Sequence, residues 1–447
     1  MSSCDQPQPE GVNYRPDRPS PASDLVDKDL PREAANAASQ LARSLVGVAG
    51  QRAISVFLER EDYVKVADMV TELKASLMLE CLPAFVRKNH GRIVFAAQFA
   101  SDGKVSDVEQ STVVVCKESR LILRDGNLYI YLPDERVVVS AEPRYSGGQR
   151  VNMSVRSSLD SIAFRDRWER FTQEHNYLRG RSFFADGKIL EQSRPCTWES
   201  ILLPEVTKSS IQRHVHGFLK NRHRLRELGV KCRRGLILSG PPGTGKTLLG
   251  KVLSSTLDAS FMWVLPRHIT EQKSFADILE IARYVAPTVV FMEDIDLFTE
   301  EREGNKWLGL GELMNQLDGA QENDDVVTIA TTNRLDVIEK ALRNRPGRFD
   351  RVIEIGAMDE ICRRDMLGKL LHHAEIDESD MEQLVAATDG HTGAQLREVV
   401  DTLYILAVEG HNGNEQTSEV RLTRSLIDTA VDEVRVERKR RLGFHVA

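Results

Sequence analysis

One short stretch of the sequence has the residue types that a triphosphate requires. Residues 240–247 read Gly-Pro-Pro-Gly-Thr-Gly-Lys-Thr, which fits the pattern G-x-x-x-x-G-K-[ST]. Glycines let backbone N–H groups turn inward without a Cβ clash, and a helix that follows points its positive end at an anion. Lys246 can reach the β- and γ-phosphates, and the Thr247 hydroxyl can ligate Mg²⁺. The pattern predicts a nucleotide site formed by Gly240, Pro241, Pro242, Gly243, Thr244, Gly245, Lys246, Thr247 and Leu248.

The residues on either side of this loop predict the two elements that must position it. The apolar run Leu236–Leu238 suits a buried strand, and residues 248–253 suit a helix. Strand, glycine loop and helix therefore occur in the order that the pattern requires.

Two later apolar runs end in side chains that suit phosphate chemistry. Residues 289–292 predict a strand of a parallel sheet buried on both faces, and Glu293 and Asp294 follow it at once. Acids at the carboxyl end of such a strand can meet Mg²⁺ and the attacking water. Residues 326–330 predict a third strand, after which Asn333 offers a polar amide to the γ-phosphate.

A short basic turn follows the third strand. Arg345 and Arg348 stand beside Pro346 and Gly347 within residues 341–351. Arginines held on a rigid turn can neutralise charge in a transition state, including that of a nucleotide bound by a neighbouring subunit.

In this order, the motifs resemble those of the AAA branch of the AAA+ ATPases, the group that contains N-ethylmaleimide-sensitive factor and valosin-containing protein. The Rieske-protein translocase belongs to a similar subset. The resemblance covers residues 196–440, and residues 390–396 match the start of a helix in the family's lid domain. It implies an α/β fold, with a P-loop NTPase core whose parallel sheet is flanked by helices and a C-terminal α-helical lid. A helical plus β-rich N-terminal region, which resembles no family, precedes this core.

The resemblance also implies roles for single residues and a need for ATP and Mg²⁺. Glu293 is expected to support Mg²⁺ together with Thr247, Asp294 to polarise water, and Asn333 to act as the sensor of the γ-phosphate. Further contacts to the nucleotide are expected from Ile201, Leu202, Gly393 and Ala394. Arg345 and Arg348 correspond to arginine fingers that act across a subunit boundary, so such proteins form rings, usually hexamers.

Three departures from the family pattern bear on the mechanism. The family usually ends its second strand in Asp-Glu, whereas this chain has Glu293-Asp294, and a shorter base is consistent with slower hydrolysis. Residues 265–273 lack the aromatic-apolar-glycine pore loop of members that thread peptides, and Trp307 is either a replacement or a packing residue. No His-Glu-x-x-His sequence occurs, which excludes the fused zinc protease of the membrane-bound members.

Composition shifts along the chain predict six ranges. These are a disordered tail at 1–32, a helical segment at 33–90, a β-rich module with a closing helix at 91–179, a linker at 180–197, a large ATPase subdomain at 198–358, and a helical lid with a tail at 359–447. The tail is rich in Pro, Ser and Asp, and the linker is punctuated by Gly and Pro.

Within the N-terminal region the patterns predict individual elements. Apolar residues at helical spacing, among them Val64 and Met69, predict a helix. Residues 120–123 and 128–132 predict two strands, which Asp125-Gly126 joins as a hairpin turn. The closing helix carries three aromatic residues for which core packing is expected, Phe164, Trp168 and Phe171.

Composition and charge bound the class of protein. A chain of 447 residues suffices for two or three domains, and a net charge of −7 argues against general nucleic-acid binding. Six scattered cysteines without a Cys-x-x-Cys pair suggest reduced thiols. With no signal pattern and no apolar run of about eighteen residues, we expect a soluble, cytoplasmic protein with no membrane partner.

We therefore expect an ATP hydrolase that assembles into a homo-oligomeric ring and remodels or disassembles a protein partner recruited through its N-terminal region. Two alternatives stay open. An ATP-gated assembly or scaffold protein with incidental hydrolysis is favoured by the missing pore-loop aromatic. A nucleic-acid motor is motivated only by the basic run within residues 220–234, which the sequence otherwise indicates as a solvated face.

Overall fold

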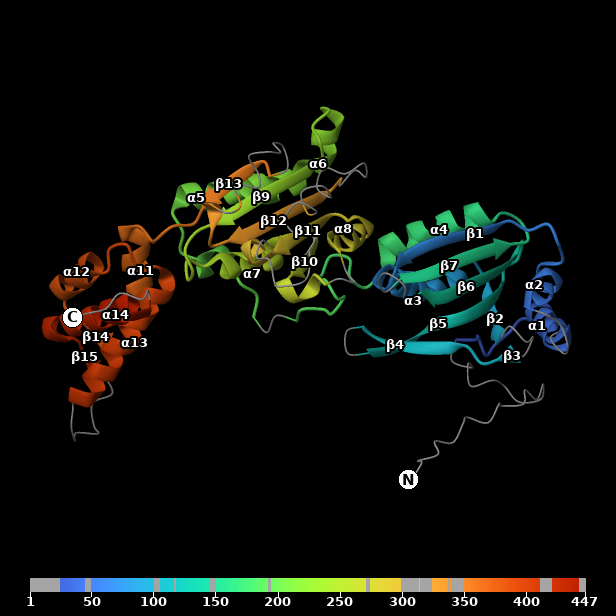
Figure 1. Ribbon diagram of the computed structural model, residues 1–447, viewed down its shortest axis with the longest axis horizontal. Coiled ribbons are helices and arrows are strands. Elements are labelled where there is room, and N and C mark those ends of the chain that lie inside the picture. The colour runs from blue at the N-terminus through green and yellow to red at the C-terminus, as the bar shows by residue number, and fades with distance from the viewer. Residues whose placement is uncertain are drawn as a thin grey trace, which may run out of the picture. The chain divides into compact units, whose positions relative to one another are not determined.

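The computed structural model describes residues 25–44, 50–99, 105–115, 118–144, 150–191, 194–270, 274–298, 313, 324–336, 338, 349–410 and 420–441. Contacts divide the chain into two units, each with its own sheet (Figure 1). The N-terminal unit runs to residue 181 and includes 186–189 and 269–286, which contains helix α8 (Phe275–Tyr284); the C-terminal unit comprises 182–185, 190–268 and 287–447. No helix in the described part of the chain is both long enough and apolar enough to cross a bilayer.

An antiparallel sheet forms the centre of the N-terminal unit. Its strands follow the order β1-β7-β6-β5-β2-β3, and β4 pairs with β5. Successive side chains alternate between the two faces, so each strand contributes one row of residues to each face. The strands are β1 (Lys65–Thr71), β2 (Arg92–Phe99), β3 (Val105–Ser106), β4 (Glu109–Val115), β5 (Glu118–Tyr131), β6 (Arg136–Arg144) and β7 (Arg150–Ser157).

Helices α1 (Arg32–Ser44) and α2 (Gly50–Leu58) pack against this sheet through a cluster of buried apolar residues. Phe57 on α2 meets Tyr129 on β5 edge to face, with ring centroids 5.2 Å apart. Such aromatic pairs add to the stabilisation that burial provides. The face of the sheet that carries Tyr129 is therefore the one that α2 covers.

Helices α3 (Glu72–Lys88) and α4 (Ser161–His175) contact each other and the sheet. Phe164 and Trp168 on α4 are fully buried, and the Trp168 indole N–H donates to the Met78 carbonyl oxygen at 3.1 Å. The predicted core role of these two aromatic residues is confirmed.

The helical assignment around Val64 and Met69 is wrong. Residues 65–71 form strand β1, which pairs antiparallel with β7 from Lys65 opposite Arg156 to Thr71 opposite Arg150. Apolar residues at approximate helical spacing did not reveal this pairing, because β-pairing depends on a partner strand far away in the sequence.

The predicted hairpin turn at Asp125-Gly126 is also wrong, because β5 runs through both residues as one strand. Asp125 pairs with Glu109 on β4, and Gly126 pairs with Ala141 on β6. Gly126 has a φ of +127°, and the register of β4 and β5 shifts next to Glu109. The glycine therefore accommodates an irregularity in a long strand instead of closing a turn.

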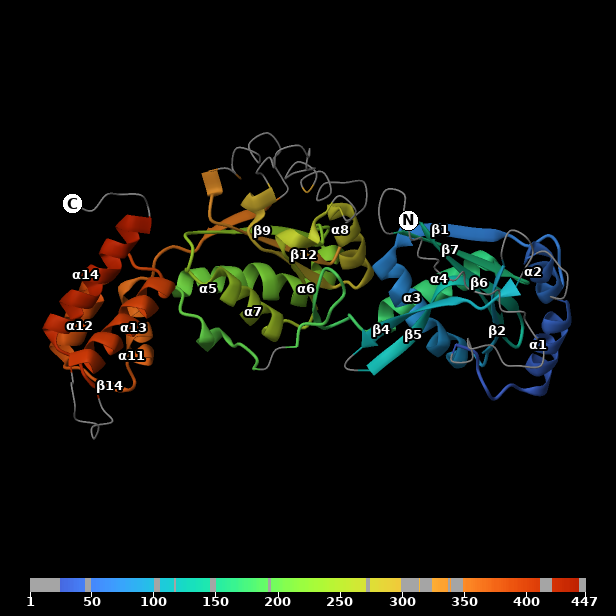
Figure 2. The ribbon, with the colours of Figure 1, turned by 60° about the horizontal axis from the view of Figure 1, so that its bottom comes forward.

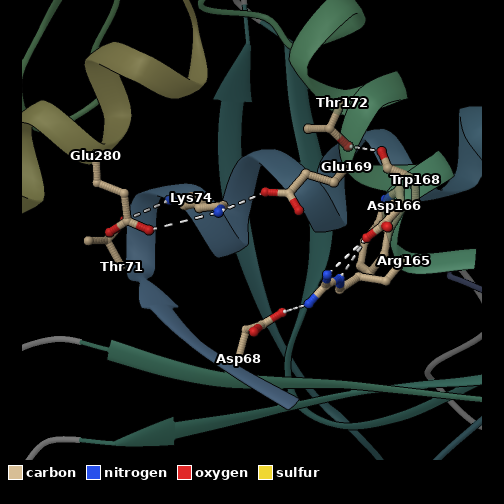
Figure 3. Close-up of polar contacts among 9 residues, drawn as sticks. All are labelled: Asp68, Thr71, Lys74, Arg165, Asp166, Trp168, Glu169, Thr172 and Glu280. Carbon is tan, nitrogen blue, oxygen red and sulfur yellow. Dashed lines mark hydrogen bonds and ion pairs between the residues drawn. The ribbon is translucent and has the colours of Figure 1, made fainter. Parts of the chain in front are cut away.

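Helix α8 belongs to the N-terminal unit, although it lies in the sequence between two strands of the other sheet. The Lys74 ammonium on α3 lies between Glu169 on α4, at 2.8 Å, and Glu280 on α8, at 3.9 Å (Figure 3). Arg150 on β7 forms an ion pair with Asp277 on α8. Charged residues of α3 and β7 thus contact α8 within this unit.

A parallel sheet forms the centre of the C-terminal unit, with strand order β13-β9-β12-β11-β10-β8. Its strands are β8 (Ser182–Phe184), β9 (Arg233–Ser239), β10 (Ser260–Val264), β11 (Thr288–Met292), β12 (Val326–Thr332) and β13 (Arg351–Glu354). β10, β11 and β12 are buried along their whole length, as their apolar runs predict. β8 lies inside the range 180–197 that composition predicts as a linker, since so short an edge strand leaves little trace in composition.

One group of helices packs against this sheet in a shared apolar cluster, and the lid helices form a separate core. A long helical stretch consists of α5 (Glu205–Gln212), a π-helical turn (Arg213–Gly217) and α6 (Phe218–Glu227), and α7 (Lys246–Thr256) follows β9. Figure 2 shows the lid helices gathered near the C-terminus, and they share their own apolar core. They are α11 (Glu360–Leu370), α12 (Glu378–Ala387), α13 (Gly393–Gly410) and α14 (Arg424–Arg441), with the short strands β14 (Ala374–Glu375) and β15 (Val420–Arg421).

Candidate active site

The strand order brings three chain segments to one edge of the parallel sheet. β12 lies between β9 and β11, and all three strands run in the same direction. The residues that follow them therefore meet at the carboxyl ends of the strands, where ligands bind in sheets of this type. These residues are the loop 240–245 after β9, the acids Glu293 and Asp294 after β11, and Asn333 after β12.

The backbone of the loop after β9 requires its glycines. Gly240, Gly243 and Gly245 have φ values of +157°, +79° and +95°, a region that L side chains rarely adopt. Space is short as well, because a Cβ on Gly240 would lie 2.0 Å from the Ile355 carbonyl oxygen. The loop is a tight turn against neighbouring backbone, as a phosphate cradle must be.

Lys246 begins α7 and is only 7% exposed. Its ammonium donates to two carbonyl oxygens of the loop at 2.7 and 2.9 Å, and to Asn333 Oδ1 at 2.8 Å. Burial lowers the pKa of Lys246, while the neighbouring carboxylates of Asp294 and Asp296 oppose that shift. The cation is therefore fixed within the loop by three acceptors.

Asn333 connects this lysine to two acids. Its Oδ1 accepts from Lys246, and its Nδ2 donates to Asp294 Oδ1 at 3.2 Å. Its backbone N–H donates to Asp296 Oδ1 at 3.3 Å. One residue at the end of β12 thus holds groups from the two strands beside it.

Asp294 has an unusual backbone conformation for a residue with a side chain. Its φ is +49°, in the left-handed region that Asp and Asn enter more readily than other such residues. Its N–H donates to Thr331 Oγ1 at 3.0 Å. Burial, and next Asp296, raise the pKa of Asp294, while Lys246 and Asn333 lower it. The reversed acid pair therefore places Asp, which tolerates this conformation better than Glu does, beside Asn333.

Glu293 and Thr247 are the two residues expected to hold Mg²⁺. Glu293 Oε1 is buried, with no hydrogen-bond partner in the described part of the protein. A buried carboxylate oxygen of this kind needs a cation or a donor. Thr247 is exposed in the first turn of α7. A carboxylate and a hydroxyl are oxygen ligands of the type that Mg²⁺ prefers, so these residues fit the ion.

Asp296 belongs to the same cluster but was not predicted from the sequence. It is 7% exposed and lies in a short turn of 3₁₀-helix (Ile295–Phe298). Its carboxylate accepts from the Asn333 backbone and perturbs the pKa values of Lys246 and Asp294. The available signal was its spacing of two residues from Asp294, which returns a side chain to the same side only in extended chain.

The expected lead-in and lid residues lie near the phosphate loop to different degrees. Ile201 is buried, with its Cδ1 3.7 Å from the position of a Cβ on Gly245, whereas Leu202 is half-buried. In the lid, the Ala394 N–H donates to the Gly243 carbonyl oxygen at 3.1 Å. A Cβ on Gly393 would lie 3.5 Å from the same oxygen, so the first turn of α13 meets the loop directly.

Residues 236–357 match the family described as "ATPase family associated with various cellular activities (AAA)". The chain contains an AAA ATPase domain. It is similar to the proteasome-activating nucleotidases of Aeropyrum pernix, at 32% identity over 279 residues (59% of this chain, 63% of the relative), and of Saccharolobus solfataricus, at 29% over 334 residues (69% and 81%). It is also similar to the ATP-dependent zinc metalloprotease FtsH 4 of Sphaerobacter thermophilus, at 32% over 252 residues (53% and 37%). The chain spans less than two thirds of the length of the first and third of these relatives.

Some predicted residues of the AAA domain lie outside the described residues. These are Arg345, Arg348 and Trp307, whose roles stay predictions. The basic run is described on α6, where Arg226 pairs with Asp325 at 3.2 Å and with Asp324 at 3.6 Å. That pairing inside the AAA domain favours the structural interpretation of the run over a nucleic-acid patch.

Proposed function

We propose that this protein binds ATP with Mg²⁺, hydrolyses it at the edge of its parallel sheet, and uses the cycle to remodel a protein partner. The observation that carries the proposal is the bridge through Asn333, which joins Lys246 to Asp294. A cation for the phosphates and a carboxylate for the attacking water are thereby held at one site, which is the arrangement that phosphoryl transfer to water needs.

In this proposal the loop and Lys246 bind the triphosphate. Lys246 exchanges its carbonyl partners for oxygens of the β- and γ-phosphates, and backbone N–H groups of the loop donate to the same oxygens. Donors that are already fixed where charge develops lower the barrier without further reorganisation. Thr247 and Glu293 would hold Mg²⁺, which neutralises charge on the β- and γ-phosphates when bound.

Asp294 acts as the base in the hydrolytic step. Its carboxylate accepts a proton from water while the water oxygen attacks the γ-phosphorus in line, and ADP departs with the electrons of the broken P–O bond. Asn333 orients the carboxylate by donating to Asp294 Oδ1, and Asp296 holds the backbone of Asn333. The three residues form one positioned unit.

A second subunit is proposed to complete each site. By family resemblance, Arg345 and Arg348 neutralise charge on the nucleotide of the neighbouring protomer. We therefore propose a homo-oligomeric ring in the cytoplasm, hexameric as is usual for AAA proteins. Size measurement with and without ATP tests this assembly.

The proposed partner is a protein. Relatives whose names state that they activate the proteasome, or that they are proteases, favour a protein substrate for this chain as well. The N-terminal unit precedes the residues matched to the AAA family, so it is the proposed recruiting part.

The substitution Asp294→Asn tests the catalytic role. Hydrolysis should fall about 10²–10⁴-fold, the usual contribution of general-base catalysis. Binding of a fluorescent ATP analogue should persist, because the amide can still interact with Asn333. The matched control is Asp258→Asn, an exposed acid after α7 that should keep the wild-type rate. Hydrolysis at the wild-type rate in Asp294→Asn refutes the role, and the trapped variant also serves to capture the partner.

A second function is an ATP-gated assembly protein whose hydrolysis is incidental. It is favoured by residues 265–273, which contain no aromatic-apolar-glycine pore sequence. Candidate proteins and single- or double-stranded nucleic acid should be compared as stimulators of hydrolysis. Stimulation by a protein supports remodelling, while ATP-dependent assembly without stimulation supports the second function. Stimulation by nucleic acid alone contradicts both.

A further inference from the structure

Arg156 on β7 is a charged residue in the interior of the N-terminal unit. It is 9% exposed and stands in a cross-strand row opposite Val138 on β6, which in turn stands opposite Tyr129 on β5. Residues directly opposite one another on neighbouring strands point to the same face. Arg156 and Tyr129 therefore share the face of the sheet that α2 covers through Phe57.

The guanidinium of Arg156 is poorly compensated for so buried a charge. Its Nη1 donates to Ser140 Oγ at 2.9 Å, and within the described residues it takes part in no ion pair. Burial lowers the pKa of Arg156, while Tyr63, Glu142 and Tyr129 oppose that shift. The Glu142 carboxylate accepts from Asn152 and Arg144. Burying a cation without a close anion is costly, and a guanidinium has five N–H donors to satisfy.

Tyr129 supplies an independent sign of a polar site on the same face. Its side chain is 0% exposed, and its hydroxyl has no hydrogen-bond partner in the part of the chain that the structure describes. Arg156 lowers the pKa of Tyr129 against the larger raising effect of burial, so the two groups interact electrostatically. Buried hydroxyls without partners are rare in native proteins.

Two neighbouring side chains on this face already form hydrogen bonds with other groups. Ser140 Oγ donates to Asn127 Oδ1 at 2.5 Å, and Asn127 Nδ2 donates to the Ala97 carbonyl oxygen at 3.2 Å. Ser140 can therefore accept from Arg156 but has no proton left for another acceptor. Lys65 on the edge strand β1 stands opposite Arg156 and adds an exposed cation at the rim.

We propose that Arg156 and Tyr129 are the recognition groups of a phosphate-binding site in the N-terminal unit, separate from the ATP site. The partners that these two side chains lack are acceptors, and a phosphate group presents oxygens in several directions to a guanidinium, a hydroxyl and a lysine at once. A bound phosphate group would also supply the negative charge that Arg156 lacks. The phosphate group belongs either to inorganic phosphate or to a small phosphate monoester.

The test uses the full chain carrying Lys246→Ala, so that the ATP loop does not contribute to phosphate binding. Thermal unfolding is followed in chloride and in phosphate or AMP at equal ionic strength. Phosphate or AMP should raise the midpoint of the N-terminal unit by about 3 °C, and the stronger of the two identifies the source. Arg156→Met should reduce this shift to its non-specific part, and should leave the midpoint in chloride unchanged or higher because it removes an uncompensated charge.

Arg136→Met is the matched control on the same sheet. Arg136 is a paired cation, with Nη1 2.7 Å from Glu59 Oε1 and 3.1 Å from the Phe57 carbonyl oxygen. Its replacement should lower the midpoint in chloride and keep the phosphate shift. Phosphate also stabilises proteins non-specifically, and that part should survive in every variant.

Tyr129→Phe keeps the ring and removes only the unpartnered hydroxyl. It therefore provides a second test if Arg156→Met does not fold. It should weaken phosphate binding at least about tenfold, as the loss of one hydrogen bond to a charged group does, without lowering the midpoint in chloride. The proposal is overturned if neither anion shifts the parent protein beyond its shift in Arg156→Met, or if Tyr129→Phe binds phosphate as the parent does.

Discussion

Two buried cations in this molecule differ in the number of hydrogen-bond acceptors and carboxylates around them. Lys246 in the AAA domain, 7% exposed, donates to three acceptors at 2.7–2.9 Å, and two carboxylates oppose the lowering of its pKa. Arg156 in the N-terminal unit, 9% exposed, donates to a single hydroxyl at 2.9 Å. Similar burial therefore accompanies very different electrostatic compensation.

The difference distinguishes two ways to prepare for an anion. In the proposed function, Lys246 gives up existing partners when a nucleotide phosphate binds, so the net gain is the difference between two sets of hydrogen bonds. Arg156 has N–H donors without acceptors, so a bound anion would add hydrogen bonds without replacing existing ones. The first arrangement suits a site that must release its product, and the second suits a site that holds its ligand.

Among the changes that test the comparison of these two cations, the largest effect is expected for Lys246→Ala. Loss of one donor aimed at developing charge costs about 10²–10³ in turnover, and release of phosphate from ATP measures it. In the same assay Arg156→Met should stay within about twofold of the wild type, since effects at independent sites do not couple. A comparable loss in Arg156→Met would show that the two cations are coupled.

A smaller effect is expected at Asp296. It tests whether Asp296 positions Asn333, which accepts a hydrogen bond from Lys246. Asp296→Ala removes the acceptor for the Asn333 backbone N–H and should lower kcat about tenfold with little change in KM, because misplacement of a catalytic group costs rate more than binding. Asp296→Asn retains a carbonyl acceptor and should recover most of the rate. If Asp296→Ala in an Asn333→Ala background costs a further tenfold, Asp296 does not act through Asn333.

The smallest effect is expected for the pH dependence of stability at Glu280. This carboxylate shares the Lys74 cation with Glu169. Burial raises the pKa of Glu280, while Lys74, Arg150 and Arg283 lower it and Asp277 raises it. A raised carboxyl pKa stabilises the fold below the unfolded pKa, and that stability is lost as pH rises through the folded pKa. The stability of the wild type relative to Glu280→Gln should therefore fall between pH 4 and 7 by about 1 kcal/mol or less.

Urea unfolding at several pH values measures this dependence. Lys74→Met removes a cation that opposes the shift, so it should make the loss of stability with rising pH steeper. If the stability of the wild type relative to Glu280→Gln rises with pH, the assignment is contradicted.

The sequence predicted most of the residues that meet at the carboxyl edge of the parallel sheet, because the pattern typical of phosphate chemistry restricts residue types and spacing. Gly240, Lys246 and Asn333 follow apolar runs whose order is that of a parallel sheet, and the structure brings them together. Asp296 was missed because its position depends on a turn of 3₁₀-helix, which periodicity does not reveal.

The N-terminal unit was harder to predict because its contacts are distant in sequence. β1 depends on pairing with β7, and β5 keeps its course through Gly126 because strands on both sides pair with it. Arg156 was not predicted, because the local sequence of an alternating strand does not distinguish a buried arginine from an exposed one.

The placement of α8 has a consequence for the order in which the protein is made. Arg150 leaves the ribosome 127 residues before its partner Asp277, and Lys74 emerges earlier still. The N-terminal unit therefore stays incomplete until β9, α7 and β10 of the other unit have been translated. Nascent chains of this protein cannot finish one unit and then begin the next, so a ribosome that stalls between residues 190 and 270 would present a β-rich unit without α8 to the cell's chaperones and proteases.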